Sequence, residues 1–224
     1  ENGGWRGWDV DAITFNDDVT TGALELFRNI VQGDKSFAWL NDSVRNKIHA
    51  AFERGLKMVL DCQVRQRGVK TAWAQQHDNI TLQPVKARTF ELPAITANES
   101  CEILLFLMGI KNPSPEVVEA IHCGVKWLRL VQIKDVKLKR VPLAPDQIIN
   151  HEYPYDLVVV KDLKAEPIWA RFYEVTNNKP FMCTRAGEKV WRLADVDPER
   201  RTGYDWYGYW PKKVFEAYAK FISR

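Results

Sequence analysis

The sequence predicts a mainly α-helical protein built from helical hairpins, with a small irregular β region toward its C-terminal side. In the first half, apolar residues recur every three or four positions, which is the spacing of one helix face. In the second half, apolar and polar residues alternate in short runs separated by Pro, Asn and Asp, the pattern of strands joined by turns. Of the 224 residues, 46% are hydrophobic, which is enough to fill the core of one large domain.

Two long helices are expected first. Residues 17–33 carry apolar side chains at helical spacing, with Asp17 or Asp18 as the N-cap and Gly33 as the stop. Residues 41–64 repeat this pattern. Their apolar stripe consists of Val44, Ile48, Phe52, Leu56, Val59 and Leu60.

Two further helices and a set of strands should follow. A third helix covers residues 97–109 and ends near Gly109, and a fourth covers residues 114–131. Ser114 is the expected N-cap of the fourth, with Pro115 at the first helical position. The strand-like runs are residues 133–141, 156–160, 168–175 and 179–184, and a short helix closes the chain at residues 211–222.

Charge and apolar pattern exclude two classes of partner. The net charge is only +3, and no run of Lys and Arg is longer than two residues, so we expect no nucleic-acid partner. No apolar run reaches 18 residues, so we expect no membrane-spanning segment.

The cysteines indicate packing rather than a zinc site. They are Cys62, Cys101, Cys123 and Cys183. None forms a C-x-x-C pair, and three of them lie in apolar helical patterns, as small buried hydrophobic residues do. Disulfides remain open if the protein is exported.

Several stretches are polar and aromatic and do not fit the pattern of a core. Loops with so many Trp, Asn, Asp and Arg residues are better explained by a functional site than by packing, although each could simply be a turn-forming loop. They are "NGGWRGWDVDAITFNDD", "TAWAQQHDNITLQPVKAR", "WARFYEVTNNKPFMCTRAGE" and "GYDWYGYWP".

In order and spacing, these stretches resemble the pectate lyases of polysaccharide lyase family 10, together with "FELP" and "NPSPEV" between them. The resemblance runs along nearly the whole chain. It implies that residues 1–224 form a single pectate lyase catalytic domain. The fold that it implies is an (α/α) toroid of helical hairpins with a small β region beside a substrate cleft.

The resemblance also implies a reaction. Members of the family cleave α-1,4-linked polygalacturonate by anti β-elimination with the help of Ca²⁺, and the arginine of the "KAR" segment, Arg88 here, is the base. Arginine is ordinarily always protonated, so this role requires a nearby cation, other basic groups and an alkaline medium to disfavour the charged form. The alternative is that Arg88 only pairs with a nearby carboxylate such as Glu91.

Several residues are candidates for binding the polyanionic substrate. Arg171 and Arg185 match arginines with which the family holds uronate carboxylates, and Lys86 is a third candidate cation. Asn16, in the "FNDD" segment, and His77, in "QQHD", are assigned to the substrate as well. For the arginines the alternative is a solvated strand edge, and for His77 it is a hydrogen-bonded structural histidine.

Asp17 and Asp18 are the candidate Ca²⁺ ligands. Asp17 matches a family carboxylate near the ion, and Asp18 could be the ligand instead, while one of the two could simply cap the following helix. Carboxylate oxygens suit Ca²⁺, which can be shared between the protein and uronate carboxylates.

The resemblance has one large departure. The chain begins at the block that matches the family's second "NGGW", so the family's N-terminal segment is apparently lacking and the toroid could be incomplete at its N-terminus. We therefore weigh two functions, a Ca²⁺-assisted pectate lyase and a non-catalytic oligogalacturonate-binding remnant. A glycoside hydrolase would need a carboxylate pair, and none stands out. We expect a secreted or periplasmic monomer.

Overall fold

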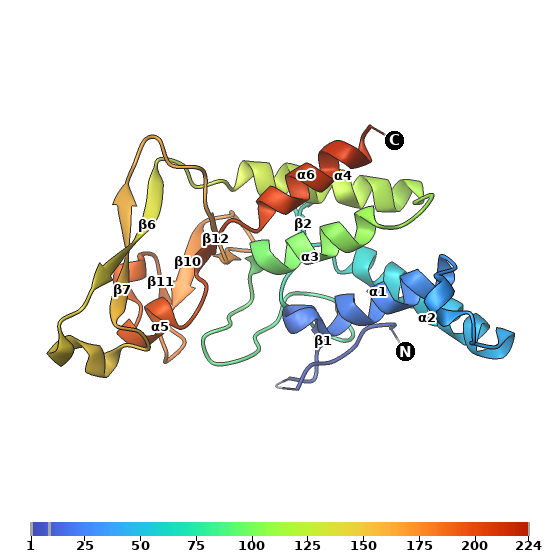
Figure 1. Cartoon of the computed structure of the whole chain (residues 1–224), viewed down its shortest axis with the longest axis horizontal. Coiled ribbons are helices and arrows are strands. Elements are labelled where there is room, and N and C mark those ends of the chain that lie inside the picture. Colours follow the sequence, from blue (N-terminus) through green and yellow to red (C-terminus); the bar gives the residue numbers. More distant parts are fainter. Residues whose placement is uncertain (1, 9, 224) are drawn as a thin grey trace.

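The computed structural model describes residues 2–8 and 10–223. Most of its helices gather toward one end of the molecule, and a long β-hairpin with the short helix α5 beside it forms the other end (Figure 1). The helices are α1 (Val19–Val31), α2 (Asp42–Asp61), α3 (Ala97–Met108), α4 (Pro115–Leu130), α5 (Pro198–Thr202) and α6 (Pro211–Phe221).

Five of these helices confirm the predictions from periodicity, and two of them, α2 and α4, begin at a side-chain N-cap. The Asn41 side chain accepts the Val44 N–H at 3.0 Å at the start of α2, and Ser114 caps α4 by accepting the Val117 N–H. At α1, Asp18 occupies the cap position but has a left-handed backbone, and its carboxylate accepts no backbone N–H there.

The strands are short, apart from one hairpin. They are β1 (Ile13–Thr14), β2 (Arg65–Gln66), β3 (Val69–Lys70), β4 (Gln76–His77), β5 (Ile95–Thr96), β6 (Val136–Pro142), β7 (Tyr155–Lys161), β8 (Trp169–Ala170), β9 (Phe172–Tyr173), β10 (Pro180–Cys183), β11 (Lys189–Val190) and β12 (Tyr207–Gly208). One sheet has four strands, in the order β11-β10-β9-β5, and every other sheet of the described residues is a single antiparallel pair: β1 with β4, β2 with β3, β6 with β7, and β8 with β12.

The prediction of a mainly α (α/α) toroid is wrong. α1 packs on α2 and α3, and α3 packs on α4 and α6, so the described helices form one packed group rather than a ring of hairpins. The physical reason lies in residues 131–210. Their apolar side chains alternate and are interrupted by turns, so they are buried by strand pairing, and only α5 and short 3₁₀ turns form there. The fold is mixed α and β with several small sheets.

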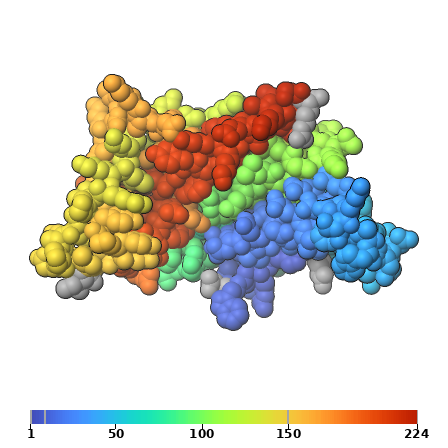
Figure 2. Space-filling model, in the orientation of Figure 1, coloured from blue at the N-terminus to red at the C-terminus, as the bar shows by residue number. Residues whose placement is uncertain are grey.

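Two apolar clusters define the interior. The larger one joins the helices around Leu24, Trp73, Phe106 and Trp127, and the smaller one lies beneath β9 and β10. Tyr207 packs against both. The loop that leads into α3 lies between the helical group and the C-terminal strands, at the lower edge of Figures 1 and 2. The predicted site residues gather near this junction.

Two other predictions concern the described residues. Cys62, Cys101, Cys123 and Cys183 are all free, and all but Cys123 are buried, as expected of small apolar residues in a core. None of the helices in the described part of the chain is both long enough and apolar enough to cross a bilayer.

Candidate functional site

Apart from His77 in β4, the predicted site residues come from four separate segments. Asn16–Asp18 form a 3₁₀ turn directly before α1. Lys86 and Arg88 lie in the loop between β4 and β5, Arg171 lies between β8 and β9, and Arg185 lies between β10 and β11. Tertiary packing therefore has to bring these segments together.

Arg88 lies in a tight turn that pairs it with Glu91. The Glu91 N–H donates to the Arg88 carbonyl at 3.0 Å, and the Arg88 Nε–H donates to Glu91 Oε2 at 2.9 Å. Nη2 donates to the other oxygen, Oε1. The Glu91 side chain is only 1% exposed, whereas that of Arg88 is 41% exposed, so a buried carboxylate holds a half-exposed guanidinium.

This pairing determines the charge state of Arg88. Its hydrogen bonds to Glu91 raise the pKa of the guanidinium above its usual range, although partial burial acts in the opposite direction. Asp17 adds to the rise through its negative charge, which shows that Asp17 lies near Arg88. In the free protein Arg88 is therefore charged and bound to Glu91, which is the alternative weighed from the sequence.

Arg171 and Glu99 form a buried ion pair, which we call the buried floor. Nη2 of Arg171 donates to Glu99 Oε1 at 2.5 Å and to Asn16 Oδ1 at 3.1 Å. The side chains of Arg171 and Glu99 are 12% and 0% exposed. Burial alone would lower the pKa of Arg171, but Glu99, Tyr204 and Glu91 together outweigh it and the pKa is raised. This ion pair is largely removed from water.

Gln75 and Tyr204 connect the two arginines. Gln75 Nε2 donates to Glu99 Oε1 at 3.1 Å and to the Tyr204 hydroxyl at 3.2 Å. That hydroxyl in turn donates to Glu91 Oε1 at 3.2 Å, and the Arg171 guanidinium lies 4.8 Å from the centre of the Tyr204 ring. A continuous polar network therefore runs from Arg88 to Arg171.

Arg88 also lines a cavity of about 510 Å³ together with two other arginines. The lining residues are Arg88, Thr89, Phe90, Arg185 and Arg200. The loop carrying Arg185 can approach this close because of Gly187, whose φ is +87° and where a Cβ would lie 2.5 Å from the Thr89 carbonyl oxygen. We call this pocket the arginine cavity.

The arginines of this cavity differ in how firmly they are held. Arg185 is 62% exposed, and its Nε lies 3.7 Å from the Glu199 carboxylate, which is a loose contact. Arg200 is 15% exposed. Phe90 lies against both Arg88 and Arg200, each at 5.2 Å from the ring centre. Cations of different solvent exposure thus line one cavity.

Two other predicted residues have different surroundings. Lys86 is exposed and makes no ion pair with any described residue. His77 is fully buried, with Nδ1 bonded to the Leu82 carbonyl at 2.8 Å and Nε2 accepting the Ala74 N–H at 3.1 Å. Burial lowers its pKa to about 4. With both ring nitrogens in use, His77 has the environment of the structural histidine that was the alternative.

Asp17 and Asp18 lie at an unusual backbone site. Their φ values are 54° and 56°, in the left-handed region that residues other than glycine rarely adopt. Both are exposed. Asn16 Nδ2 donates to Asp17 Oδ2 at 3.0 Å, and the Thr21 hydroxyl donates to Asp18 Oδ1 at 3.4 Å. Asp18 stands at the N-cap position of α1, but neither carboxylate accepts a backbone N–H of that helix, so both have lone pairs available.

The surroundings of these carboxylates fit a cation in part. Burial, Glu99 and Asp18 together raise the pKa of Glu102 to about 8, and the buried Glu99 Oε2 has no hydrogen-bond partner. Crowded carboxylates of this kind would be relieved by positive charge. However, among the described residues no three acidic, histidine or cysteine side chains surround a common point. The protein alone supplies an incomplete shell.

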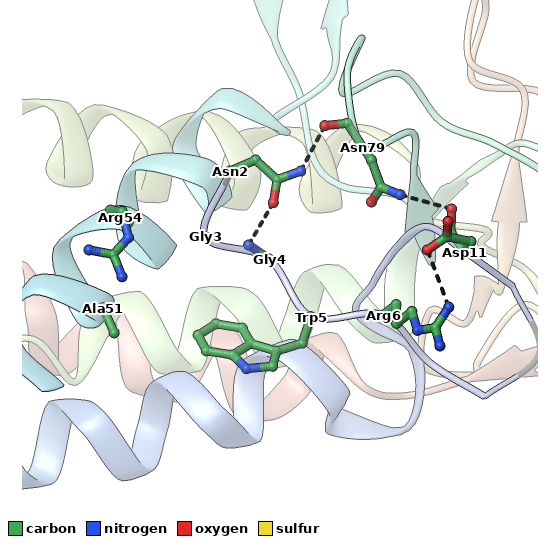
Figure 3. Close-up of a pocket in the computed structure, with 9 residues that line it drawn as sticks. All are labelled: Asn2, Gly3, Gly4, Trp5, Arg6, Asp11, Ala51, Arg54 and Asn79. Carbon is green, nitrogen blue, oxygen red and sulfur yellow. Dashed lines mark hydrogen bonds and ion pairs between the residues drawn. The ribbon is translucent and has the colours of Figure 1, made fainter. Parts of the chain in front are cut away.

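The "NGGW" segment lies elsewhere, beside a second cavity of about 600 Å³ (Figure 3). Gly3 has a φ of +85°, and a Cβ there would lie 2.5 Å from the Arg54 carbonyl carbon, so this glycine allows the chain to pack on α2. Asn2 donates to the Asn79 carbonyl at 2.7 Å. Trp5 and Arg54 line this cavity, but none of the predicted site residues does.

Sequence reasoning missed several members of the site. Glu99 had a signal, because it shares a helix face with Ile103 and Phe106, and a charged residue on an apolar face indicates a buried pair. Tyr204 lay in a stretch already noted as polar and aromatic. Arg200, in "DPERRTG", had no signal that separates it from an ordinary charged turn.

Comparisons with known proteins agree with one another. The sequence model of a family described as pectic acid lyase matches residues 2–215. The fold is similar to that of a family 10 polysaccharide lyase from Cellvibrio cellulosa, with a TM-score of 0.83 and 27% identity over 99% of this chain and 68% of that one. It is also similar to a mutant of such a lyase from the same organism in complex with trigalacturonic acid, with a TM-score of 0.82, 27% identity and the same coverage. A search of curated proteins found no match.

Proposed function

Because the chain belongs to the pectic acid lyase family, and is therefore a lyase, we propose that it cleaves α-1,4-linked polygalacturonate by anti β-elimination, with Arg88 as the base. The resemblance to family 10 polysaccharide lyases is confirmed. The observation that carries the proposal is the arginine cavity, where Arg88, Arg185 and Arg200 meet. A polyuronate carries one negative charge per sugar, and guanidinium groups bind carboxylates through paired hydrogen bonds.

In the proposed reaction, the C5 proton of a uronate moves to a nitrogen of Arg88. The electrons of the C5–H bond form the C4=C5 double bond, the bond from C4 to the glycosidic oxygen breaks, and that oxygen takes up a proton from water. Negative charge develops on the uronate carboxylate while the proton leaves. Arg185 and Arg200 lie at the same cavity as Arg88 and would stabilise that charge.

The base must be neutral when it accepts the proton. Glu91 favours the charged form of Arg88 in the free protein, whereas the positive charge of Arg185 and Arg200, and that of a bound cation, would act in the opposite direction. We expect the rate to rise toward alkaline pH, where a neutral guanidine is less costly. A maximum near pH 5 would instead indicate a base with a pKa like those of carboxylates or histidine.

Asp17 and Asp18 are the residues that would hold Ca²⁺. When bound, the ion would supply positive charge beside the substrate carboxylate. Ca²⁺ takes about six to eight oxygen ligands, more than two aspartates provide, so uronate oxygens would complete the shell. Ca²⁺ and substrate should then bind with positive coupling, each tightening the other by the same factor.

The coupling is measured by titrating Ca²⁺ into the protein with and without trigalacturonate. We expect weak binding alone and tighter binding with the sugar. Tight binding by the protein alone would contradict the shared site. Absence of binding even with the sugar would remove Ca²⁺ from the proposed reaction.

The reaction itself is tested with polygalacturonate by following the ultraviolet absorbance of the unsaturated product, with and without a chelator. We expect absorbance to grow and the chelator to slow it. An increase in absorbance that the chelator does not change would support the lyase activity and exclude a role for Ca²⁺ in it. Reducing ends that accumulate without unsaturation would show hydrolysis instead.

The alternative is a non-catalytic protein that binds oligogalacturonate. It is favoured by the pair between Arg88 and Glu91, which keeps the guanidinium charged. Binding of trigalacturonate without any unsaturated product from polygalacturonate, at any alkaline pH, would support it. Because polymeric pectate is an extracellular substrate, we propose a secreted or periplasmic location, with residues 1–224 acting as one domain and as a monomer.

A further inference from the structure

Glu91 is a buried carboxylate whose two oxygens are both occupied. Oε2 accepts the Arg88 Nε–H at 2.9 Å and the Arg88 backbone N–H at 3.3 Å. Oε1 accepts Nη2 of Arg88 and the Tyr204 hydroxyl, the latter at 3.2 Å. A side chain that is 1% exposed and bonded in this way has little freedom to rotate.

These contacts restrict Arg88 as well. Two of the three guanidinium nitrogens, Nε and Nη2, donate to Glu91. The third, Nη1, donates to no described residue, and the side chain is 41% exposed. One face of the group lies against Phe90 at 5.2 Å. Nη1 is therefore the nitrogen left to contact a ligand in the arginine cavity.

We propose that Glu91 is the positioning residue of Arg88, because it holds Nε and Nη2 and so presents Nη1 to the substrate. Tyr204 supports it by fixing Oε1. The inference rests on the proposed function, since it assigns Glu91 a part in the same elimination. Neither the family match nor the structural comparisons assign a role to Glu91 or Tyr204.

The need for such a residue follows from the arginine side chain. Its long chain has many rotamers in solution, and a base that is misplaced by about 1 Å can cost about 10²-fold in rate. A bidentate pair removes this freedom because it fixes both the distance and the plane of the guanidinium. The i, i+3 turn that joins Arg88 to Glu91 adds a fixed backbone geometry.

The test compares Glu91→Gln with Asp195→Asn. Asp195 is a matched control, since it binds Arg192 through two hydrogen bonds, at 2.9 and 2.6 Å, with the same i, i+3 spacing, and it does not line the arginine cavity. We expect Glu91→Gln to lower kcat on polygalacturonate by about 10- to 100-fold with little change in KM, since the base is misplaced. Asp195→Asn should match the wild type.

The pH profile separates positioning from a merely structural effect. The neutral amide of Glu91→Gln no longer favours the charged guanidinium, so the alkaline rise in kcat should begin at lower pH than in the wild type. A kcat within twofold of the wild type and a superimposable profile would overturn the inference. A loss of kcat with an unshifted profile, or an equal loss in Asp195→Asn, would also overturn it.

A milder variant covers the case in which Glu91→Gln does not fold. Tyr204→Phe removes only the hydroxyl that donates to Oε1 and leaves the ion pair with Arg88 in place. It should lower kcat by about two- to tenfold, the factor that corresponds to a typical net hydrogen bond. An unchanged kcat in a folded Tyr204→Phe protein would remove Tyr204 from the assignment. If Glu91→Gln is also unfolded, that result would leave Glu91 a structural residue and overturn the inference.

A readout that needs no activity separates this inference from the proposed function. The Arg88 Nε–H should give a nuclear magnetic resonance signal that is protected from solvent exchange, lost in Glu91→Gln and retained in Asp195→Asn. If the wild type makes no unsaturated product but shows this pattern, the proposed function fails, whereas the positioning of Arg88 by Glu91 is supported. An Arg88 signal that exchanges as fast as that of a solvated arginine would contradict the positioning of Arg88 by Glu91, whatever the activity of the protein.

Discussion

The buried floor and the arginine cavity hold their arginines in opposite ways. On the floor, Arg171 is 12% exposed and bound to a carboxylate that is fully buried. At the cavity, Arg185 is 62% exposed and has one loose carboxylate contact at 3.7 Å. The resemblance assigns both arginines to binding uronate carboxylates. They differ in solvent exposure, and only the removal of Arg171 would leave a buried carboxylate without its cation.

The difference separates support from ligand binding. An arginine that is paired to a buried carboxylate cannot be given up without leaving that charge unpaired. An exposed arginine loses little when it exchanges a loose contact for a uronate. We therefore expect the floor to set stability and the cavity to set affinity, with Arg88 between them because it is held by Glu91 and exposed to the cavity.

Arg88→Ala should give the largest effect. General base catalysis contributes about 10² to 10⁴-fold, so formation of unsaturated product should fall by this factor. The melting temperature should fall as well, because the buried Glu91 carboxylate loses its cation, so the rate is measured well below that temperature. Arg88→Lys should recover little of the rate, because an ammonium group cannot reproduce the planar guanidinium with its paired N–H donors. Arg192→Ala is the matched control outside the cavity and should keep full activity. Retention of most of the turnover by a folded Arg88→Ala protein would contradict the role of Arg88.

Arg171→Ala should mainly destabilise the fold. It leaves the Glu99 carboxylate buried without its cation, and breaking such a buried pair costs about 3 to 5 kcal/mol. Urea unfolding of the variant and of wild type measures this directly. A loss below about 1 kcal/mol, together with loss of trigalacturonate binding, would move Arg171 to the ligand-binding side of the comparison.

Acid should destabilise the fold through the buried His77. Its pKa falls from 6.5 to about 4 on burial, so the unfolded chain binds a proton more readily. The stability it contributes is present above pH 6.5 and is lost as pH falls toward 4, up to on the order of 3 kcal/mol. His77→Gln should flatten this part of the pH dependence of unfolding, whereas the exposed His49→Gln should leave it unchanged. Equal profiles for the two variants would contradict the assignment.

Arg185→Ala should have the smallest effect on the protein and a measurable effect on its ligand. Its affinity for oligogalacturonate should fall by about 1.5 to 3 kcal/mol, the range for a hydrogen bond to a charged group. Calorimetric titration measures this, and stability should stay within about 0.5 kcal/mol of wild type, as for most surface substitutions. A sharp drop in melting temperature with unchanged affinity would show that Arg185 stabilises the fold rather than binding the ligand.

Local patterns in the sequence predicted five of the six helices and the segments of strands β6 to β10. They did not predict helix α5 or the short strands β1 to β5, β11 and β12. The Ser114 cap of α4 depends on neighbours a few positions away and is present as expected. The apolar stripe of α2 is buried only in part, since Phe52 and Val59 are buried but Val44 is exposed. The toroid was inferred from resemblance rather than from such patterns. It failed because the arrangement of helices depends on which faces meet, and alternating segments such as β6 and β7 pair with each other instead of forming hairpins of helices.

The site was partly predictable for the same reason. Arg88 and Arg185 do meet at one cavity, and Asp17 lies near Arg88, as the polar loops suggested. The environments were not predictable, because burial and pairing arise only when distant segments pack. Glu99 is 72 positions away from Arg171, and Tyr204 is 113 positions away from Glu91, so no local pattern links them.

A crystal structure of Arg88→Ala with trigalacturonate tests the central claim most directly, because this variant should bind the sugar without cleaving it. We predict uronate carboxylates on Arg185 and Arg200 in the arginine cavity, with Glu99 still bound to Arg171 beneath. Sugar bound beside Trp5 and Arg54 in the cavity of Figure 3, with the arginine cavity holding only water, would contradict it.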